Sequence, residues 1–154
     1  MSRAMMATLI LGALALAFSC ATPAENRRDA LLRVSREYNE GLRWGRYQDV
    51  TPHLAADEAE RFLARTGAVG DDFQMADEEV SAIRFEDDGR RAAITVQFTW
   101  YNQRRALVRN TVVAQDWRYA DGRWICASQR RVSGDRFPLV PEPMLSRQEA
   151  AQGS

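Results

Sequence analysis

The sequence predicts an α+β domain, with helices first and a meander of antiparallel strands after them. Apolar residues recur at steps of three and four between Leu31 and Leu42, which is the period of an amphipathic helix. Residues 92–101 alternate apolar and polar side chains instead, which is the period of a half-buried strand. Asp121-Gly122 is a residue pair that tight hairpin turns favour. Along the chain, apolar residues are therefore spaced first as in helices and then as in strands.

The first helix is expected to begin near Arg27 and to end between Gly41 and Gly45. A short second helix is expected over 47–54, where Pro52 interrupts it. The inward face of the first helix should carry Leu31, Val34 or Ser35, Tyr38 and Leu42.

A third helix is expected to begin at Asp57, because Glu60 follows three residues later and completes a capping-box pattern. Its apolar side should hold Ala59, Phe62 and Leu63. Glycines and paired acidic residues over 66–72 predict a loop after it.

Two hairpins are expected next. A strand over 80–86 should pair with residues 92–101 through a turn at Asp88-Gly89, and a four-residue loop over 102–105 should then pair Trp100 with Leu107. The period of two places alternate residues of each strand on one face of the sheet.

The turn at Asp121-Gly122 should form a third hairpin, with Tyr119 opposite Trp124 and Trp117 opposite Cys126. The resulting apolar face runs across three strands, and the helices can cover it. Its expected members are Ile94, Val96, Phe98, Leu107, Val113, Trp117, Tyr119, Trp124 and Cys126. The four tryptophans, Trp44, Trp100, Trp117 and Trp124, are expected to supply core rather than to line a ligand cavity.

The N-terminal residues have the pattern of a secretory signal peptide: Arg3, then an uncharged apolar run, then Ser19-Cys20. Residues 17–20, Ala-Phe-Ser-Cys, resemble the bacterial lipobox, in which the cysteine after the cleavage point receives lipid. Cys20 is therefore the expected lipidation site, and the membrane is an expected partner through that anchor. An ordinary secretory peptide or a retained signal anchor are the alternatives. Ala21 is not Asp, so the resemblance implies the outer membrane of a bacterial envelope, facing the periplasm.

This interpretation divides the chain into four parts. Residues 1–20 form a lipoprotein signal peptide, 21–26 a tether, 27–134 the α+β domain, and 135–154 a proline-containing extended segment with a flexible tail. The piece Phe137–Val140 either packs on the domain or binds a partner.

The charges balance overall, with 21 arginines, no lysine and 21 acidic residues, so the sequence gives no support for nucleic-acid binding. They are segregated, however: residues 57–88 hold eleven acidic residues and three arginines, and residues 89–136 hold ten arginines and three acidic residues. Either the domain has an acidic and a basic side, or the two segments pack together and neutralise each other.

Cys126 has no intrachain partner if Cys20 is lipidated, so we expect its thiol to be buried among apolar side chains. His53 is the one histidine, and no cluster has the spacing of metal ligands or a phosphate loop. The sequence therefore predicts no catalytic thiol, no metal and no cofactor.

Two segments carry a resemblance to a known family: residues 38–47, Tyr-Asn-Glu-Gly-Leu-Arg-Trp-Gly-Arg-Tyr, and residues 115–124, Gln-Asp-Trp-Arg-Tyr-Ala-Asp-Gly-Arg-Trp. Together they resemble the nuclear transport factor 2-like superfamily, which includes SnoaL-like proteins and many small bacterial lipoproteins. The resemblance covers roughly residues 27–132 and implies a cone, in which a strongly curved antiparallel sheet wraps around N-terminal helices. It leaves function open, because one fold hosts enzymes, carriers and scaffolds.

Enzymes of this superfamily place their chemistry inside the cone, so polar residues on the expected apolar face form the candidate pocket. They are Arg109, Thr111, Gln115 and Ser128, with Tyr38 and His53 from the helices. An isomerase site also needs a carboxylate base in an apolar pocket, and no Asp or Glu can be assigned there. The competing interpretation is a sheet edge that reaches solvent.

Two functional hypotheses follow. The first is a non-enzymatic envelope lipoprotein that binds or assembles with another envelope component close to the membrane. The second is a protein whose pocket binds or isomerises a small apolar molecule.

Overall fold

The computed structural model describes residues 22–86 and 89–142. The expected signal peptide, the lipidation site Cys20 and the expected tail over 143–154 lie outside these residues. The elements run α1 (Pro23–Arg43), α2 (Tyr47–Val50), the 3-10 turn η1 (Thr51–His53), α3 (Ala56–Val69), β1 (Phe73–Glu86), β2 (Arg91–Asn102), β3 (Leu107–Ala120) and β4 (Arg123–Gly134).

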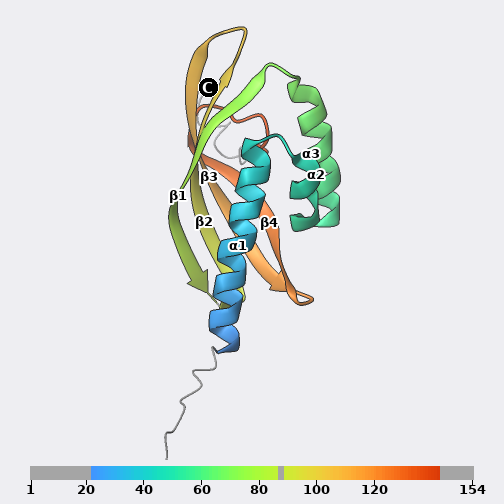
Figure 1. The fold of residues 1–154 in the computed structure, drawn as a ribbon, viewed down its shortest axis with the longest axis vertical. Helices are drawn as coiled ribbons and strands as arrows, with labels where there is room; N and C mark the ends of the chain where they lie inside the picture. The colour runs from blue at the N-terminus through green and yellow to red at the C-terminus, as the bar shows by residue number, and fades with distance from the viewer. Residues whose placement is uncertain (1–21, 87–88, 143–154) are drawn as a thin grey trace, which may run out of the picture.

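The four strands form one antiparallel meander in the order β1-β2-β3-β4. The sheet is curved, α1 runs along one of its faces, and α2 and α3 lie beside α1 (Figure 1). The expected α+β architecture, with helices packed on a curved antiparallel sheet, is confirmed.

Helix α1 begins earlier than the sequence suggested. Pro23 is its first residue, and Thr22 caps it by accepting a hydrogen bond from the backbone N–H of Glu25, whose carboxylate accepts one from the Thr22 N–H. Part of the expected tether, residues 23–26, is therefore helical. The helix ends at Arg43, with Gly45 in the left-handed region at φ 65°, as the glycine pattern predicted.

Helix α3 also differs from expectation at both ends. Its N-cap is Ala55, whose side chain caps nothing, so Asp57 is a first-turn residue and not a cap. Asp57 and Glu58 both bind Arg61 instead, at 2.8 and 3.0 Å. The helix continues to Val69 through part of the segment expected to be loop, and Gly70 ends it.

The hairpin at Asp121-Gly122 is confirmed. Both residues have positive φ, 51° and 78°, as a two-residue turn that matches strand twist requires. Tyr119 pairs with Trp124, and Trp117 with Cys126, in the expected register.

The β2–β3 hairpin is shifted by two residues from the expected register. Asn102 pairs with Leu107, so Trp100 lies opposite Arg109 and not opposite Leu107. A shift of two residues leaves every side chain on its expected face of the sheet. Leu107 nevertheless lies at the exposed tip of the hairpin.

Strand β1 is twice as long as the sequence suggested, because it begins at Phe73. Its first half contains Asp77, Glu78 and Glu79, which are poor strand formers, and its pairing with β2 is interrupted by two register shifts. Pairing with the whole of β2 overrides the local preference. Arg43 of α1 binds Asp77 and Glu78 at 3.3 and 3.2 Å and offsets their charge.

The core lies between α1 and the inner face of the sheet and contains Leu31, Tyr38, Leu42, Phe98, Trp117 and Cys126. The Cys126 thiol is fully buried, as expected, and burial raises its pKa far above the ordinary value. Trp100, Trp117 and Trp124 are core residues, but the expectation fails for Trp44, which is 65% exposed and lies under the Arg43 guanidinium.

The segment after β4 packs on the domain. Phe137, Leu139 and Val140 are all buried in the core, so the folded body extends beyond the expected boundary at residue 134. The chain turns inward at Gly134, which has φ 83°. Asp135 then donates its N–H to the Asn110 carbonyl at 2.9 Å.

Gly134 and Gly122 provide a matched test of this turn. Both have φ near 80°, but a Cβ on Gly134 would lie 2.2 Å from the Asn110 carbonyl oxygen, whereas nothing lies within 4 Å of a Cβ on Gly122. We expect Gly122→Ala to lower the free energy of unfolding by about 1–2 kcal/mol, the cost of the left-handed backbone alone.

Gly134→Ala should lower the free energy of unfolding by roughly 3 kcal/mol or more, because the steric clash adds to that backbone cost. Urea denaturation followed by tryptophan fluorescence measures both. Equal losses in the two variants would contradict the close approach at Gly134.

Candidate functional site

Three of the sequence-predicted pocket residues, Arg109, Thr111 and Gln115, lie on the inner face of the sheet, but they do not surround a cavity. Arg109 lies over the Trp100 ring, 5.6 Å from its centre, and binds the Asp135 carboxylate at 3.0 Å. Thr111 is fully buried, accepts a hydrogen bond from Trp100 Nε1 at 3.0 Å and donates one to the Asp135 carbonyl at 2.8 Å. Both side chains hold the segment after β4 against β3.

Gln115 connects the sheet to helix α1. Its Nε2 donates to Asn39 Oδ1 at 2.8 Å, and its Oε1 accepts from Trp117 Nε1 at 3.2 Å. Asn39 in turn donates to the Ser35 carbonyl at 2.9 Å. This chain of polar groups is buried and mutually satisfied, so Gln115 is neither a pocket residue nor a sheet-edge residue that reaches solvent.

Ser128 faces outward, contrary to expectation, and donates to the Asp116 carboxylate at 2.7 Å. The cause is a register shift in β4: Trp117 pairs with Cys126, but Asp116 pairs with Ser128. One extra residue, Ala127, reverses the faces beyond it. Gln129 therefore takes the inward place opposite Gln115.

Tyr38 and His53 do lie close together, with ring centres 6.5 Å apart. Tyr38 is fully buried, and desolvation raises the pKa of its hydroxyl well above the ordinary value, so the group stays neutral. The Tyr38 hydroxyl and the Gln129 amide have no hydrogen-bond partner among the described residues. Partial burial lowers the pKa of His53, which favours the neutral imidazole.

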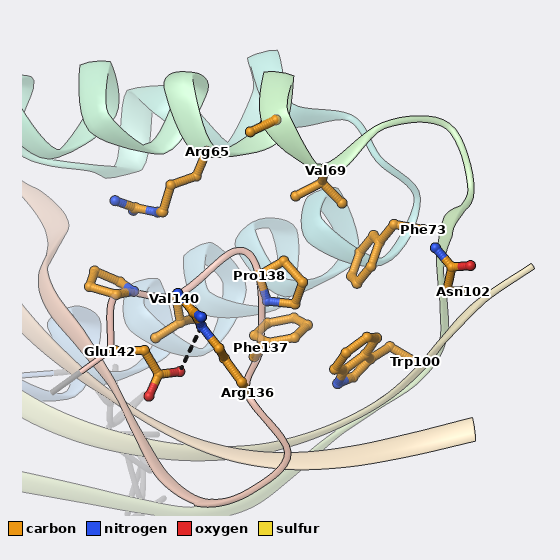
Figure 2. Close-up of a pocket in the computed structure, with 12 residues that line it drawn as sticks. Arg65, Val69, Phe73, Trp100, Asn102, Arg136, Phe137, Pro138, Val140 and Glu142 are labelled. Atoms are coloured by element: carbon orange, nitrogen blue, oxygen red, sulfur yellow. Dashed lines mark ion pairs between the residues drawn. The ribbon is translucent and has the colours of Figure 1, made fainter. Parts of the chain in front are cut away.

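One pocket of the described residues lies at the mouth of the cone and has a volume of about 510 Å³. Figure 2 shows it between α3, the start of β1, the end of β2 and the segment after β4. Its apolar wall consists of Val69, Phe73, Trp100, Phe137, Pro138 and Val140, and its polar side chains include Arg65, Asn102, Arg136 and Glu142.

Phe137 separates this pocket from the interior of the cone. Its ring stacks on Phe98 at 5.0 Å and lies 6.0 Å from both Phe73 and Trp100. Phe73, Trp100 and Phe137 form the floor of the pocket, and the buried Phe98 ring packs behind Phe137.

Arginine side chains fix the segment that forms this wall. Glu58 on α3 binds Arg65, and Arg65 Nε donates to the Leu139 carbonyl at 3.3 Å. Arg131 binds the Glu142 carboxylate through Nε and Nη2, with the shortest distance 2.7 Å. Hydrogen bonds from Arg131 lower the pKa of Glu142, so this carboxylate is a weak base.

Within residues 22–86 and 89–142, no three potential metal-ligating side chains are grouped closely enough to hold an ion. No helix of the described part of the chain is long and apolar enough to cross a membrane.

Sequence reasoning missed this pocket because its walls come from four separate elements. The one available signal was the apolar piece Phe137–Val140, for which packing and partner binding both remained open. The packing alternative is confirmed.

The solved structures that resemble this chain include an NTF2-like protein and a protein with a cystatin-like fold. An NTF2-like protein from Cytophaga hutchinsonii has a TM-score of 0.54 and 12% sequence identity, and the match covers 69% of this chain and 97% of that one. The fold is NTF2-like. A protein of unknown function with a cystatin-like fold from Nostoc punctiforme has a TM-score of 0.52 and 12% identity, with 71% and 91% of the two chains covered. The sequence matches no protein-family model and no curated protein.

The buried position of Gln115 leads to a stability prediction. Gln115→Ala removes the partner of Asn39 Oδ1 and of Trp117 Nε1, and each buried group left unpaired costs about 1–3 kcal/mol. We expect the free energy of unfolding to fall by about 2–4 kcal/mol in urea denaturation. Gln97→Ala, at an exposed position of β2, is the control and should change it by about 0.5 kcal/mol or less. A loss for Gln115→Ala as small as the control's would contradict the buried network.

Proposed function

We propose that this protein is a non-enzymatic binding module of the bacterial cell envelope, held close to the membrane by lipid on Cys20. The domain holds a partner or ligand and does not transform it. The observation that carries this proposal is the closure of the cone interior by the chain's own residues, with Phe137 stacked on Phe98. The lipobox-like residues before Cys20 support the anchor.

The polar groups near the pocket also favour binding over proton transfer. A carbon acid isomerase needs a carboxylate with a raised pKa or an available lone pair in an apolar site. Glu142, the carboxylate in the pocket lining, is instead bound by Arg131 and has a lowered pKa. Gln115 and Thr111 donate their protons to protein acceptors.

A second function, binding of a small apolar molecule, is favoured by the mouth pocket. Its volume of about 510 Å³ lies in the range of small-molecule sites, and aromatic side chains form its floor. Arg131 and Arg136 both bind Glu142, at 2.7 and 3.8 Å, so these three side chains leave one net positive charge at the rim, which suits a ligand with an anionic end.

The anchor is tested by Cys20→Ala in the full-length chain. We expect the protein to move from the membrane fraction to the soluble or unprocessed pool, because no other residue in the lipobox-like segment carries a thiol. Intact-mass analysis of the wild type should show a lipidated chain that begins at Cys20. An unmodified mature chain that begins at another residue would exclude the anchor. Cys126→Ala is the control and should remain in the membrane fraction.

The pocket is tested with 8-anilinonaphthalene-1-sulfonate, a probe with an aromatic body and one sulfonate. We expect saturable binding, measured by probe fluorescence, and at least about a tenfold loss of affinity in Ala68→Trp, because the new ring fills the pocket.

Ala64→Trp is the matched control, one turn earlier on α3 at an exposed position outside the pocket lining, and should bind like the wild type. Equal affinity in both variants would remove the mouth pocket as the binding site.

A further inference from the structure

A second pocket, of about 520 Å³, lies at the opposite end of α1 from the Gly45 turn. The N-terminal half of α1 forms one wall, η1 and the β3–β4 turn form the others, and the lining includes Arg27, Arg33, His53, Tyr119, Arg123 and Trp124. Three arginines from two separate parts of the chain therefore meet around one hollow.

The charge of this pocket is positive. None of its lining residues is acidic. The carboxylate whose charge acts on the pKa of His53 is Glu37, one helical turn after Arg33 on α1, and it is not part of the lining. The capping box of Thr22 and Glu25 already uses N-terminal N–H groups of α1. The guanidinium groups, not the helix end, would therefore bind an anion.

Aromatic side chains line the same hollow. The Arg27 guanidinium lies 5.9 Å from the centre of the Tyr119 ring, and Trp124 Nε1 donates to the Arg27 carbonyl at 2.8 Å. Tyr119 and Trp124 contact each other edge to face, with ring centres 5.5 Å apart. Arginine beside tyrosine and tryptophan suits the boundary between lipid phosphates and acyl chains.

The position of the pocket also favours a lipid as its ligand. Pro23, the first residue of α1, is part of the lining and lies three residues after Cys20. Three residues span at most about 11 Å, so a lipid on Cys20 would place this pocket beside the headgroups.

We propose that this basic pocket binds the phosphate of an anionic phospholipid headgroup and thereby sets the orientation of the domain on the membrane. The location argument rests on the proposed anchor at Cys20, whereas the charge and aromatic lining do not. The lipid phosphate accepts hydrogen bonds from the guanidinium groups of Arg33 and Arg123. No covalent step is involved.

The test uses a chain that begins at residue 21 and therefore lacks Cys20. The core cluster extends from Leu31 to Val140, so this chain retains all of it. Because the anchor is absent, failure of lipidation at Cys20 and failure of this proposal give separate results. Binding is measured by vesicle co-sedimentation, with phosphatidylcholine vesicles that do or do not contain phosphatidylglycerol.

We expect binding to the phosphatidylglycerol vesicles alone, and a decrease with added salt. The double variant Arg33→Gln, Arg123→Gln should weaken binding about 10- to 30-fold, as expected for two arginines near an anionic surface. The matched control, Arg105→Gln with Arg130→Gln, removes the same net charge from exposed positions outside the pocket and should weaken binding less than about threefold. Circular dichroism and thermal melts confirm that both double variants fold.

Three results would overturn the proposal. One is equal binding to both kinds of vesicle, and another is an equal loss in the two double variants. The third is saturable binding of inorganic phosphate, measured by calorimetry, without preference for phosphatidylglycerol vesicles, because it would assign the pocket to a free anion.

Discussion

The packing of Phe137 against aromatic residues of β1 and β2 is the contact on which the mouth of the cone depends. Its ring stacks on Phe98 and approaches Phe73 and Trp100, so one side chain joins the segment after β4 to two strands that precede it. A buried aromatic side chain contributes roughly 1.5–3 kcal/mol through removal of apolar area from water. The inward turn at Gly134 makes this position possible, because a side chain there would collide with the Asn110 carbonyl.

Polar side chains on the inner face also hold the segment after β4 in place at the mouth of the cone. Thr111 and Arg109 hold Asp135, and Arg65 holds the Leu139 carbonyl. Because the Thr111 hydroxyl is buried, it requires partners, and the indole of Trp100 and the Asp135 carbonyl supply them. Gln115 performs a comparable role deeper in the cone, where it connects Asn39 of α1 to Trp117 of the sheet. The polar residues that interrupt the apolar face thus fix the positions of neighbouring elements.

Local sequence predicted the elements and much of the core, because helical and strand periods reflect burial on one face. The hairpin at Asp121-Gly122 was predicted to the residue, since its backbone needs two positive φ values that few residue pairs adopt. The bulge at Ala127 has no such signal, so Ser128 was placed inward and Gln129 was missed. Trp44 is apolar and helically spaced, yet it lies just past the helix end and stays 65% exposed.

The two pockets could not be predicted from local sequence patterns, for a different reason. Each combines residues from elements far apart along the chain, such as Arg65 with Trp100 or Arg27 with Arg123. Composition showed that residues 89–136 are rich in arginine, but not which arginines meet. Arg109 and Arg131 bind Asp135 and Glu142, whereas Arg123 joins two arginines of α1.

The late position of Phe137 in the chain has a consequence for truncated chains. A chain that ends at Gly134 keeps every helix and strand of the described residues, but Phe98 and Trp100 lack the ring that covers them. Such a chain exposes an aromatic surface, the kind of surface that chaperones and other unfolded chains recognise. The next six residues, through Val140, supply the missing cover. Completion of the fold therefore depends on a short segment that belongs to no helix or strand, and proteolytic loss of that segment would leave a domain prone to aggregation.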